Sequence, residues 1–247
     1  MQSQIISFSQ TILTAVSNYL YPTRCIFCHE FLEAQDAQCC DSCYSDIDRI
    51  DCFFCPKCGK KREEASELCF DCSTKPHYFE SGRAMYVYEG AIKKSLFGLK
   101  FFHETWVGKT FGQLLAQYYL ELELFEVDLV LPIPLHILRR IKRGYNQAEI
   151  VGQSFSLYAK LIYESNALLR HKWTKPQKDL TEIERKSNLE NAFSLKKSKV
   201  DLIKGKRILL IDDIYTTGTT IDSCAKLLYE NGANKVYFLT IAIGSGL

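Results

Sequence analysis

From residue 76 onward, short continuous apolar runs alternate with stretches in which apolar residues recur at helical spacing. The continuous runs predict buried strands, and the helical spacing predicts amphipathic helices. We expect strands at 84–88, 128–134, 167–170, 207–212 and 236–243, and helices at 90–100, 109–122, 146–160 and 219–230. Fully apolar strands that alternate with helices are typical of a parallel sheet with both faces covered. We therefore predict an α/β domain over residues 76–247.

The N-terminal segment has a weaker helical pattern, with apolar residues falling near one face. It contains no Lys or Arg in its first twenty residues, so the charged region that opens a secretion signal is missing. We predict a helix over residues 1–24 that docks on the next module; contact with a membrane surface or a partner is the alternative. The sequence contains no apolar run long enough to cross a membrane.

Composition adds little to this pattern. The chain has 247 residues, of which 47% are hydrophobic, enough for a globular core and for one or two domains. Lys and Arg exceed Asp and Glu by only 31 to 29, so the net charge is +2. Such a small overall charge does not indicate a nucleic-acid-binding protein, although it leaves room for a local basic patch.

Ten of the eleven cysteines lie between residues 25 and 72. Clustered cysteines in a chain without a secretion signal, which is expected in the cytosol, indicate metal ligands rather than disulfides. A Cys-x-x-Cys pair can aim two sulfurs at one point, and two pairs supply the four ligands of a structural zinc site. We predict two successive zinc ribbons over residues 25–75, each with one structural zinc. The predicted ligands are Cys25, Cys28, Cys40, Cys43, Cys55, Cys58, Cys69 and Cys72.

The spacing leaves alternatives open. Cys39 could replace Cys40, and Cys52 forms another Cys-x-x-Cys pair with Cys55. The same knuckles could also pair in a cross-braced order, and a disulfide knot would need an oxidising compartment. Four-sulfur sites leave no open coordination position, so we expect a structural or docking role rather than catalysis by zinc.

The strand at 207–212 runs into two adjacent acids, Asp212 and Asp213, and then into a threonine-rich loop before the next helix. Ligands of open α/β sheets bind at the carboxyl ends of the strands. Backbone N–H groups in such a loop and at a helix N-terminus suit a phosphate, while the carboxylates suit sugar hydroxyls and can share Mg²⁺. We predict a ribose 5-phosphate site. The phosphate would lie on Thr216, Thr217, Gly218, Thr219 and Thr220.

Two further segments carry polar or basic residues that suit an anion. Pro134 closes the strand at 128–134, and the segment from Arg143 to Gln147 is expected at the start of a helix, which favours negative charge. We predict that Pro134 and Arg143 complete the ribose-phosphate site. A second basic segment, at 174–188, has the composition of a loop. A solvated basic surface is the alternative for both.

The stretch from Ile208 to Thr220 resembles the phosphoribosyl-pyrophosphate motif of type I phosphoribosyltransferases. The resemblance implies a type I phosphoribosyltransferase-like fold, with a mostly parallel sheet and helices on both faces, and phosphoribosyl pyrophosphate with Mg²⁺ as the ligand. In an active enzyme, Asp212 and Asp213 would bind the ribose hydroxyls. Lys175, Lys178 or Arg185 would stabilise the leaving pyrophosphate. We identify no nucleobase hood and no general base, so the sequence supports ligand binding more strongly than turnover.

Nearly the whole chain is similar to the ComF proteins. The similarity rests on the double zinc ribbon, the phosphoribosyl motif and these segments: Tyr21-Pro22-x-x-Cys25, Leu99-Lys100-Phe101, Pro132-x-Pro134, Arg143-Gly144-Tyr145-Asn146-Gln147, and Pro176-Gln177 with Arg185 and Asn188. It implies a cytoplasmic role in natural transformation, at the inner face of the cytoplasmic membrane beside a competence helicase and the DNA channel. Incoming single-stranded DNA would contact Arg139, Arg140, Arg143, Tyr145 and Lys178.

Two functions are therefore weighed. The first is a competence protein that handles single-stranded DNA, in which the phosphoribosyl site is a sensor, a site for the DNA backbone phosphate or an active site. The second is an active phosphoribosyltransferase that acts on an unidentified acceptor. A zinc-ribbon transcription or RNA-binding factor ranks last, because it would leave the C-terminal motif unexplained.

Overall fold

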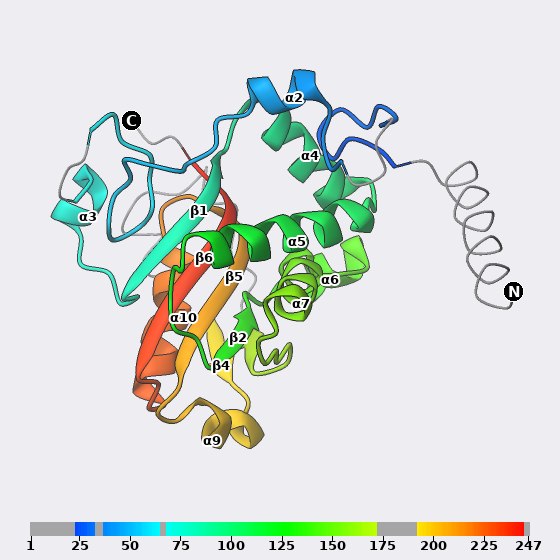
Figure 1. Cartoon of the computed structure of the whole chain (residues 1–247). Helices are drawn as coiled ribbons and strands as arrows, with labels where there is room; N and C mark the ends of the chain where they lie inside the picture. The colour runs from blue at the N-terminus through cyan, green and yellow to red at the C-terminus, as the bar shows by residue number, and fades with distance from the viewer. Residues whose placement is uncertain (1–22, 33–36, 65–67, 172–191, 245–247) are drawn as a thin grey trace, which may run out of the picture. The chain divides into compact units, whose positions relative to one another are not determined.

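The structure, a computed structural model, describes residues 23–32, 37–64, 68–171 and 192–244 (Figure 1). It divides into two compact units, residues 1–47 and residues 48–247, which we describe separately. The predicted N-terminal helix lies almost entirely outside the described residues, as do Lys175, Lys178 and Arg185. Among the described helices, none has the length and apolar character needed to cross a bilayer.

The described part of the first unit is a cysteine knuckle followed by the short helix α2 (Asp41–Asp46). Arg24 and Phe31 form an antiparallel bridge that closes the knuckle, and within it the Cys25 N–H donates to the Glu30 carbonyl at 2.8 Å. None of the α2 residues is buried. Ile26 and Phe27 of the knuckle are buried, and a segment with so few buried apolar residues is expected to need a metal for its fold.

A parallel sheet forms the centre of the second unit. Its strands are β1 (Ser81–Val87), β2 (Leu129–Pro132), β5 (Arg207–Tyr215) and β6 (Lys235–Ile243), in the order β1-β6-β5-β2. All three pairings are parallel, with Leu129 opposite Ile208 and Ile208 opposite Val236. The two central strands are apolar almost throughout, as expected for strands covered on both faces.

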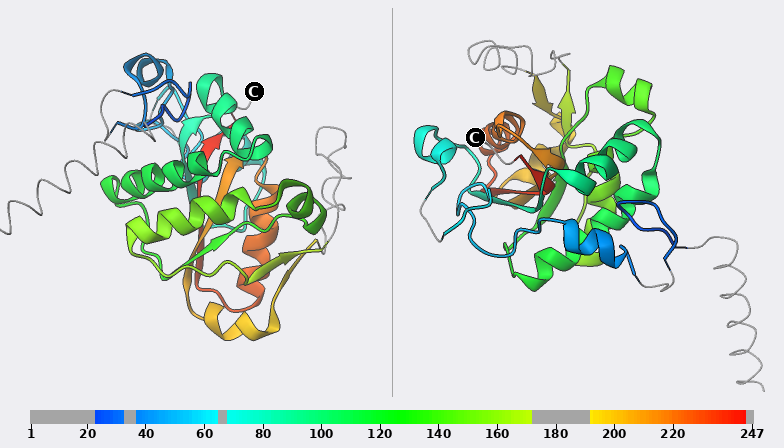
Figure 2. Two further views of the ribbon diagram at one scale, coloured as in Figure 1. Left: turned by 90° about the vertical axis from the view of Figure 1, so that its right-hand side faces the viewer. Right: turned by 90° about the horizontal axis from the view of Figure 1, so that it is seen from above.

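Helices lie on both faces of this sheet (Figure 2). One face carries α5 (Thr105–Glu121) and α7 (Gln147–Ala159), and the other carries α10 (Thr219–Glu230). The helix α4 (Gly90–Phe101) follows β1 and packs on α5. Phe111 of α5 and Phe155 of α7 are fully buried, because their amphipathic faces meet the apolar strands. The predicted α/β architecture is confirmed.

Some boundaries differ from the prediction. β5 continues past Asp212 to Tyr215, since it stays paired with β6 as far as Tyr215 opposite Ile243. The predicted helix at 109–122 starts earlier, at Thr105. The structure also contains elements that we did not predict: α3 (Phe70–Thr74), α6 (Ile137–Arg143), β4 (Phe193–Leu195), η2 (Lys197–Lys199) and α9 (Val200–Ile203). β4 pairs antiparallel with β3 (Leu168–Arg170).

The segment from Arg143 to Gln147, expected at the start of a helix, spans the end of one helix and the start of the next. Arg143 is the last residue of α6, which ends because Gly144 adopts a left-handed conformation with φ of 82°. The next helix, α7, starts at Gln147, and the side chain of Asn146 caps it by accepting from the Ala148 N–H at 3.2 Å. Arg143 therefore lies at a helix C-terminus, where the helix dipole favours its positive charge.

Candidate functional site

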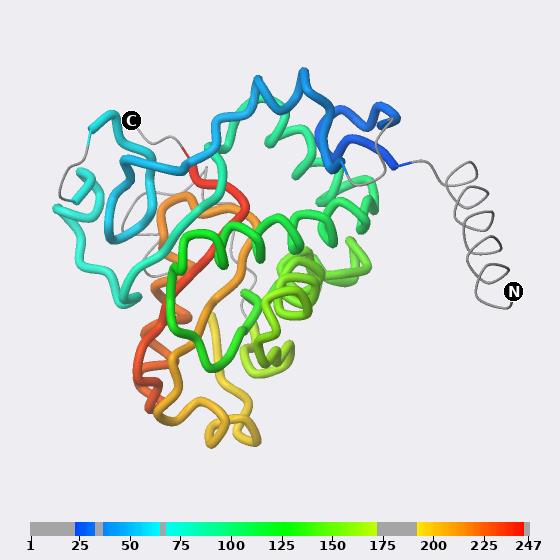
Figure 3. The backbone as a smooth tube through the Cα atoms, in the orientation of Figure 1, coloured from blue at the N-terminus to red at the C-terminus, as the bar shows by residue number. Residues whose placement is uncertain are grey.

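A cleft of about 230 Å³ opens at the carboxyl ends of β2 and β5. Pro132, the last residue of β2, is paired with Ile211, so the next residues of β5 extend beyond their neighbour. The chain then runs through a short loop into α10, a path that Figure 3 traces. The residues that line the cleft are Lys100, Ile133, Pro134, Leu135, Arg139, Arg143, Asn146, Gln147, Arg170, Asp212, Asp213 and Thr220.

Asp213 is buried at the floor of this cleft, with 4% of its surface exposed. Lys100, from the last turn of α4, forms an ion pair with its carboxylate, and the Gln147 amide donates to it at 3.5 Å. The guanidinium of Arg143 donates in turn to the side-chain oxygen of Gln147. Burial opposes ionisation of Asp213, but the charge of Lys100 and these hydrogen bonds outweigh it and lower its pKa.

Asp212 behaves in the opposite way. Burial, and then the negative charge of Asp213 beside it, raise the pKa of Asp212 well above its usual value. Its Oδ1 accepts from the backbone N–H of Asp213 at 2.8 Å. The two neighbouring carboxyls are thus shifted in opposite directions, so Asp212 holds its proton more readily than Asp213 and can donate where Asp213 accepts. Such a pair matches two adjacent hydroxyl groups of a sugar.

The loop between β5 and α10 provides backbone donors next to the acids. Gly218 precedes α10 with φ of 75°, a conformation that side chains disfavour, and the helix has twelve residues. Thr217 and Thr219 share a hydrogen bond of 2.8 Å between their hydroxyls, and Thr220 lines the cleft. The positive end of the α10 dipole thus faces the same space as the acids, which suits a phosphate.

Most of the predicted phosphate-site residues come together here. Asp212, Asp213, Thr220, Pro134 and Arg143 line the cleft, joined by Arg139 from the predicted DNA contacts. Thr216, Thr217 and Gly218 form the adjoining loop, and Thr219 is the first residue of α10.

Two predicted DNA contacts do not line the cleft. Arg140 is paired with Glu149 at 2.8 Å. The hydroxyl of Tyr145 donates to the Leu99 carbonyl, and its ring packs against His103 with the centroids 5.7 Å apart.

Sequence reasoning did not assign Lys100, Asn146, Gln147 or Arg170 to the site. Asn146 donates to the Ile133 carbonyl at 2.9 Å and so fixes the loop after β2. Arg170 lies at the end of β3, where burial, followed by the nearby charge of Arg139, lowers its pKa. The sequence could have indicated Lys100, because a lysine between Leu99 and Phe101 at the end of an amphipathic helix can extend its side chain toward the protein interior. Its partner lies 113 positions further along the chain, beyond the reach of local patterns.

Replacing Lys100 with methionine should lower the free energy of unfolding by about 3 kcal/mol at pH 7, because the buried carboxylate of Asp213 loses its cation. The ion pair stabilises the fold fully above the ordinary carboxyl pKa of about 4 and is lost as the pH falls through the lowered pKa of Asp213. In urea unfolding, the difference between wild type and variant should therefore begin to shrink below about pH 4 and disappear once the pH is below the lowered pKa of Asp213. Lys94→Met, an exposed change on the same helix, serves as the control. A constant difference between wild type and Lys100→Met across this pH range would contradict the assignment.

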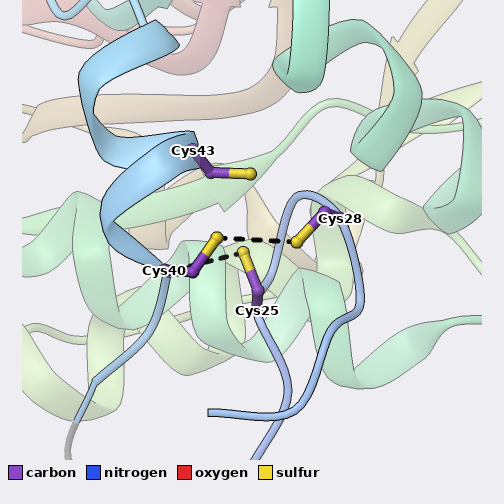
Figure 4. Close-up of side chains that lie close together, drawn as sticks. All are labelled: Cys25, Cys28, Cys40 and Cys43. Carbon is purple, nitrogen blue, oxygen red and sulfur yellow. Dashed lines mark hydrogen bonds between the residues drawn. The ribbon is translucent and has the colours of Figure 1, made fainter.

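In the first unit, the sulfurs of Cys25, Cys28, Cys40 and Cys43 all lie within 4.8 Å of one another (Figure 4). The distance between the sulfurs of Cys28 and Cys40 is 3.6 Å. Tetrahedral zinc with bonds of about 2.3 Å places its sulfurs about 3.8 Å apart, so the group fits zinc. A hydrogen bond with Ser42 lowers the pKa of Cys40 to about 6, which favours the thiolate that binds metal. Cys39 is not a member of this group.

The second group, Cys55, Cys58, Cys69 and Cys72, meets the same distance limit, and all four residues are buried. The Cys55 sulfur accepts from the Cys69 N–H at 3.3 Å, and hydrogen bonding from Cys58 lowers the pKa of Cys55 to about 4. Cys52 is exposed and lies outside the group. Both groups therefore have the donors and spacing of structural zinc sites, with no open position for a substrate.

Comparison with known proteins gives two domain matches. Residues 16–73 match the double zinc ribbon domain, and residues 126–244 match the phosphoribosyl transferase domain. The fold is therefore that of a type I phosphoribosyltransferase-like domain, here with its parallel sheet and helices on both faces, preceded by zinc ribbons.

Relatives match over most of the chain. Competence protein ComFC of Streptococcus pneumoniae is 34% identical over 207 residues, which cover 83% of this chain and 87% of the relative. Competence protein F of Haemophilus influenzae is 29% identical over 219 residues, with 86% and 93% covered. DNA utilization protein YhgH of Escherichia coli is 29% identical over 219 residues, with 87% and 94% covered.

Solved structures are similar over about half of the chain. A hypoxanthine phosphoribosyltransferase from Staphylococcus aureus aligns with a TM-score of 0.36 and 18% identity, covering 53% of this chain and 62% of that one. Glutamine phosphoribosylpyrophosphate amidotransferase from B. subtilis aligns with a TM-score of 0.36 and 20% identity, covering 53% of this chain and 25% of that one.

Proposed function

Because the chain belongs to the ComF family of competence proteins, we propose that it holds phosphoribosyl pyrophosphate in the cleft and handles single-stranded DNA during natural transformation. Its place of work is the cytoplasm, at the inner face of the membrane. Its partners there are the competence helicase or the DNA channel. The two zinc sites hold the ribbons in shape rather than taking part in chemistry.

The observation that carries the ligand proposal is the meeting of acids, phosphate loop and arginines around one cleft. Asp212 and Asp213 take the ribose hydroxyls, and the loop before α10 takes the 5-phosphate on its N–H groups. Arg139, Arg143 and Arg170 surround the remaining space, where their charges suit a pyrophosphate. Mg²⁺ would accompany the pyrophosphate and neutralise part of its charge.

Replacing Asp212 and Asp213 together with asparagine is expected to weaken phosphoribosyl-pyrophosphate binding about 100-fold, because the charge-assisted hydrogen bond from the ribose to Asp213 and the hydrogen bond to Asp212 are both weakened. Isothermal titration calorimetry with Mg²⁺ present measures the effect. Asp201→Asn removes a carboxylate from α9 that pairs only with Lys204 among the described residues, so it is the matched control. Unchanged affinity in the double variant would exclude the cleft as the ligand site.

The DNA part of the proposal depends on the basic residues at the cleft and on α6. A strand held mainly through its phosphates loses affinity steeply as salt rises. Adding single-stranded DNA to the calorimetric titration separates the roles of the cleft, since a strand that occupies it will compete with phosphoribosyl pyrophosphate. DNA binding that does not change with salt, or that is absent, would remove this part of the function.

The alternative function, an active phosphoribosyltransferase, needs a site for the acceptor. Among the described residues that line the cleft, none is aromatic, and the apolar wall consists of Ile133, Pro134 and Leu135. This lining supports a holding site more than a nucleobase-transfer site. Release of pyrophosphate from phosphoribosyl pyrophosphate in the presence of protein and Mg²⁺, at a rate that Asp212→Asn abolishes, would establish turnover instead.

A further inference from the structure

The C-terminal end of α4 exposes three phenylalanine rings, of which one packs against each of the other two. Phe97, Phe101 and Phe102 are 50%, 58% and 67% exposed. The ring centroids of Phe97 and Phe101 are 4.6 Å apart, and those of Phe97 and Phe102 are 5.7 Å apart. Single exposed apolar residues are common on protein surfaces, but a contiguous group of aromatic rings indicates a binding surface. We call these three residues the Phe cluster.

Positive charges surround the Phe cluster. Lys93 and Lys94 are exposed one turn before Phe97 on α4, because residues three and four positions apart share a helix face. On the other side, the guanidinium of Arg143 lies over the ring of Phe101, 5.6 Å from its centroid. The rings therefore lie between two basic positions.

Arg143 connects this surface to the cleft. It lines the cleft, together with Lys100, which immediately precedes Phe101 in the sequence. Lys100 turns inward to Asp213, while its neighbour Phe101 stays exposed. The Phe cluster thus lies on the rim of the proposed phosphoribosyl site. The positive charges of Lys93, Lys94 and Arg143 beside it are complementary to a polyanion.

We propose that the Phe cluster is a stacking platform for the bases of a single-stranded nucleic acid whose phosphodiesters contact Lys93, Lys94 and Arg143. This inference rests on the proposed handling of single-stranded DNA and adds the surface that does it. Every base has a flat face that can stack on an aromatic ring, so such a platform binds strands of many sequences. A purely apolar protein partner would gain nothing from the flanking cations, whereas a nucleic acid uses both the rings and the charges.

The test compares a thymidine oligonucleotide of about 12 nucleotides with an abasic oligonucleotide of the same length and charge, by fluorescence anisotropy. The wild-type protein should bind the base-containing strand at least about 10-fold more tightly, because stacking adds to the phosphate contacts. Phe97→Leu with Phe101→Leu keeps the surface apolar but removes two rings, and it should abolish this preference. The salt dependence should stay as in the wild type, since no cation is changed. Phe70→Leu, which removes a ring 73% exposed on α3, should bind like the wild type.

The outcomes separate this inference from the proposed function. Equal wild-type affinity for the two strands, or a double Phe variant that keeps the preference, would overturn the platform and leave DNA handling intact. A wild-type protein that binds neither strand would overturn both. Calorimetry with phosphoribosyl pyrophosphate should give wild-type affinity in the double variant, which shows that the fold and the cleft are preserved. If the rings instead join two copies of the chain, the double variant will change the mass in solution, which also overturns the platform.

Discussion

Replacing Cys58 and Cys69 with serine is expected to weaken phosphoribosyl-pyrophosphate binding at least about 100-fold, although neither residue lines the cleft. The second cysteine group belongs to the same hydrophobic core as β5, β6 and α10. Structural zinc contributes roughly 10 kcal/mol or more to the folding of a small ribbon. Without the metal, the four cysteines no longer pack in fixed positions in this core. We then expect Tyr215 and Ile221, which belong to the same core and flank the proposed phosphate loop, to lose part of their packing.

The connection runs through three aromatic rings. Phe79, which follows Cys72 of the second cysteine group, meets Phe238 of β6 edge-on with the centroids 4.9 Å apart. Phe238 stacks on Tyr215, the last residue of β5, with centroids 4.7 Å apart and planes 5° from parallel. All three rings are buried. Tyr215 therefore lies between the ribbon and the loop that follows it, and a shift of the ribbon reaches Gly218.

A second connection joins the ribbon segment to α10. The Nδ1 atom of His77 lies 2.6 Å from the Asp222 carboxylate, and the N–H of Tyr78 donates to the same carboxylate at 2.9 Å. Asp222 is in the first turn of α10, the helix whose N-terminus borders the proposed phosphate site. The segment after Cys72 thus helps to fix the direction of that helix.

The matched control is Cys28→Ser with Cys40→Ser, in the first unit. Each double variant should lose one equivalent of zinc, measured by release to a chromogenic chelator. Only the Cys58 and Cys69 variant should lose the ligand, as measured by calorimetry. Circular dichroism at the titration temperature shows whether secondary structure persists. Ligand binding that survives loss of the second zinc would show that the sheet holds the loop without the ribbon.

An element of this fold can be predicted from the sequence when the residues that determine it are adjacent in the chain. β6 and α10 are recovered almost to the residue, because a run of apolar residues and a helical repeat report directly on burial. By contrast, α6 has only seven residues and none of them is buried, so its apolar positions follow no core-facing pattern. β3 and β4 are separated in the sequence by a region outside the described residues. No local sequence pattern predicts that these two strands pair.

The site shows the same division. The acids and the threonine loop are contiguous in sequence, and the chemistry of the residues is sufficient to predict a phosphate ligand. The state of the acids is not predictable in this way, because it depends on Lys100 and Gln147 from two other helices. The choice of Cys40 over Cys39 is similar, since it depends on the start of α2, which follows Cys40 directly. The spacing of the cysteines identifies Cys39 and Cys40 as candidate zinc ligands, and the three-dimensional structure shows which of the two lies with the other sulfurs.

Gly218→Ala is expected to weaken phosphoribosyl-pyrophosphate binding between about 10- and 100-fold, through the same tyrosine. A Cβ atom at this position would lie 2.3 Å from the hydroxyl oxygen of Tyr215 and 2.8 Å from its Cζ. Tyr215 cannot move aside easily, because its ring is stacked on the buried ring of Phe238. The loop must shift instead, and its N–H groups then no longer converge on the phosphate.

Gly205→Ala is the control that separates backbone strain from this collision. Gly205 also has a left-handed conformation, with φ of 69°, but a Cβ atom there would meet nothing within 4 Å. Gly205→Ala should cost about 1 kcal/mol of unfolding free energy in urea, since a left-handed conformation is unfavourable for alanine, and Gly218→Ala should cost at least as much because of the added collision. Only Gly218→Ala should also lose the ligand in calorimetry. If Gly218→Ala and Gly205→Ala bind phosphoribosyl pyrophosphate with the same affinity, the loop does not hold the phosphate. The packing of Tyr215 against the ribbon segment would then contribute to stability and not to ligand binding.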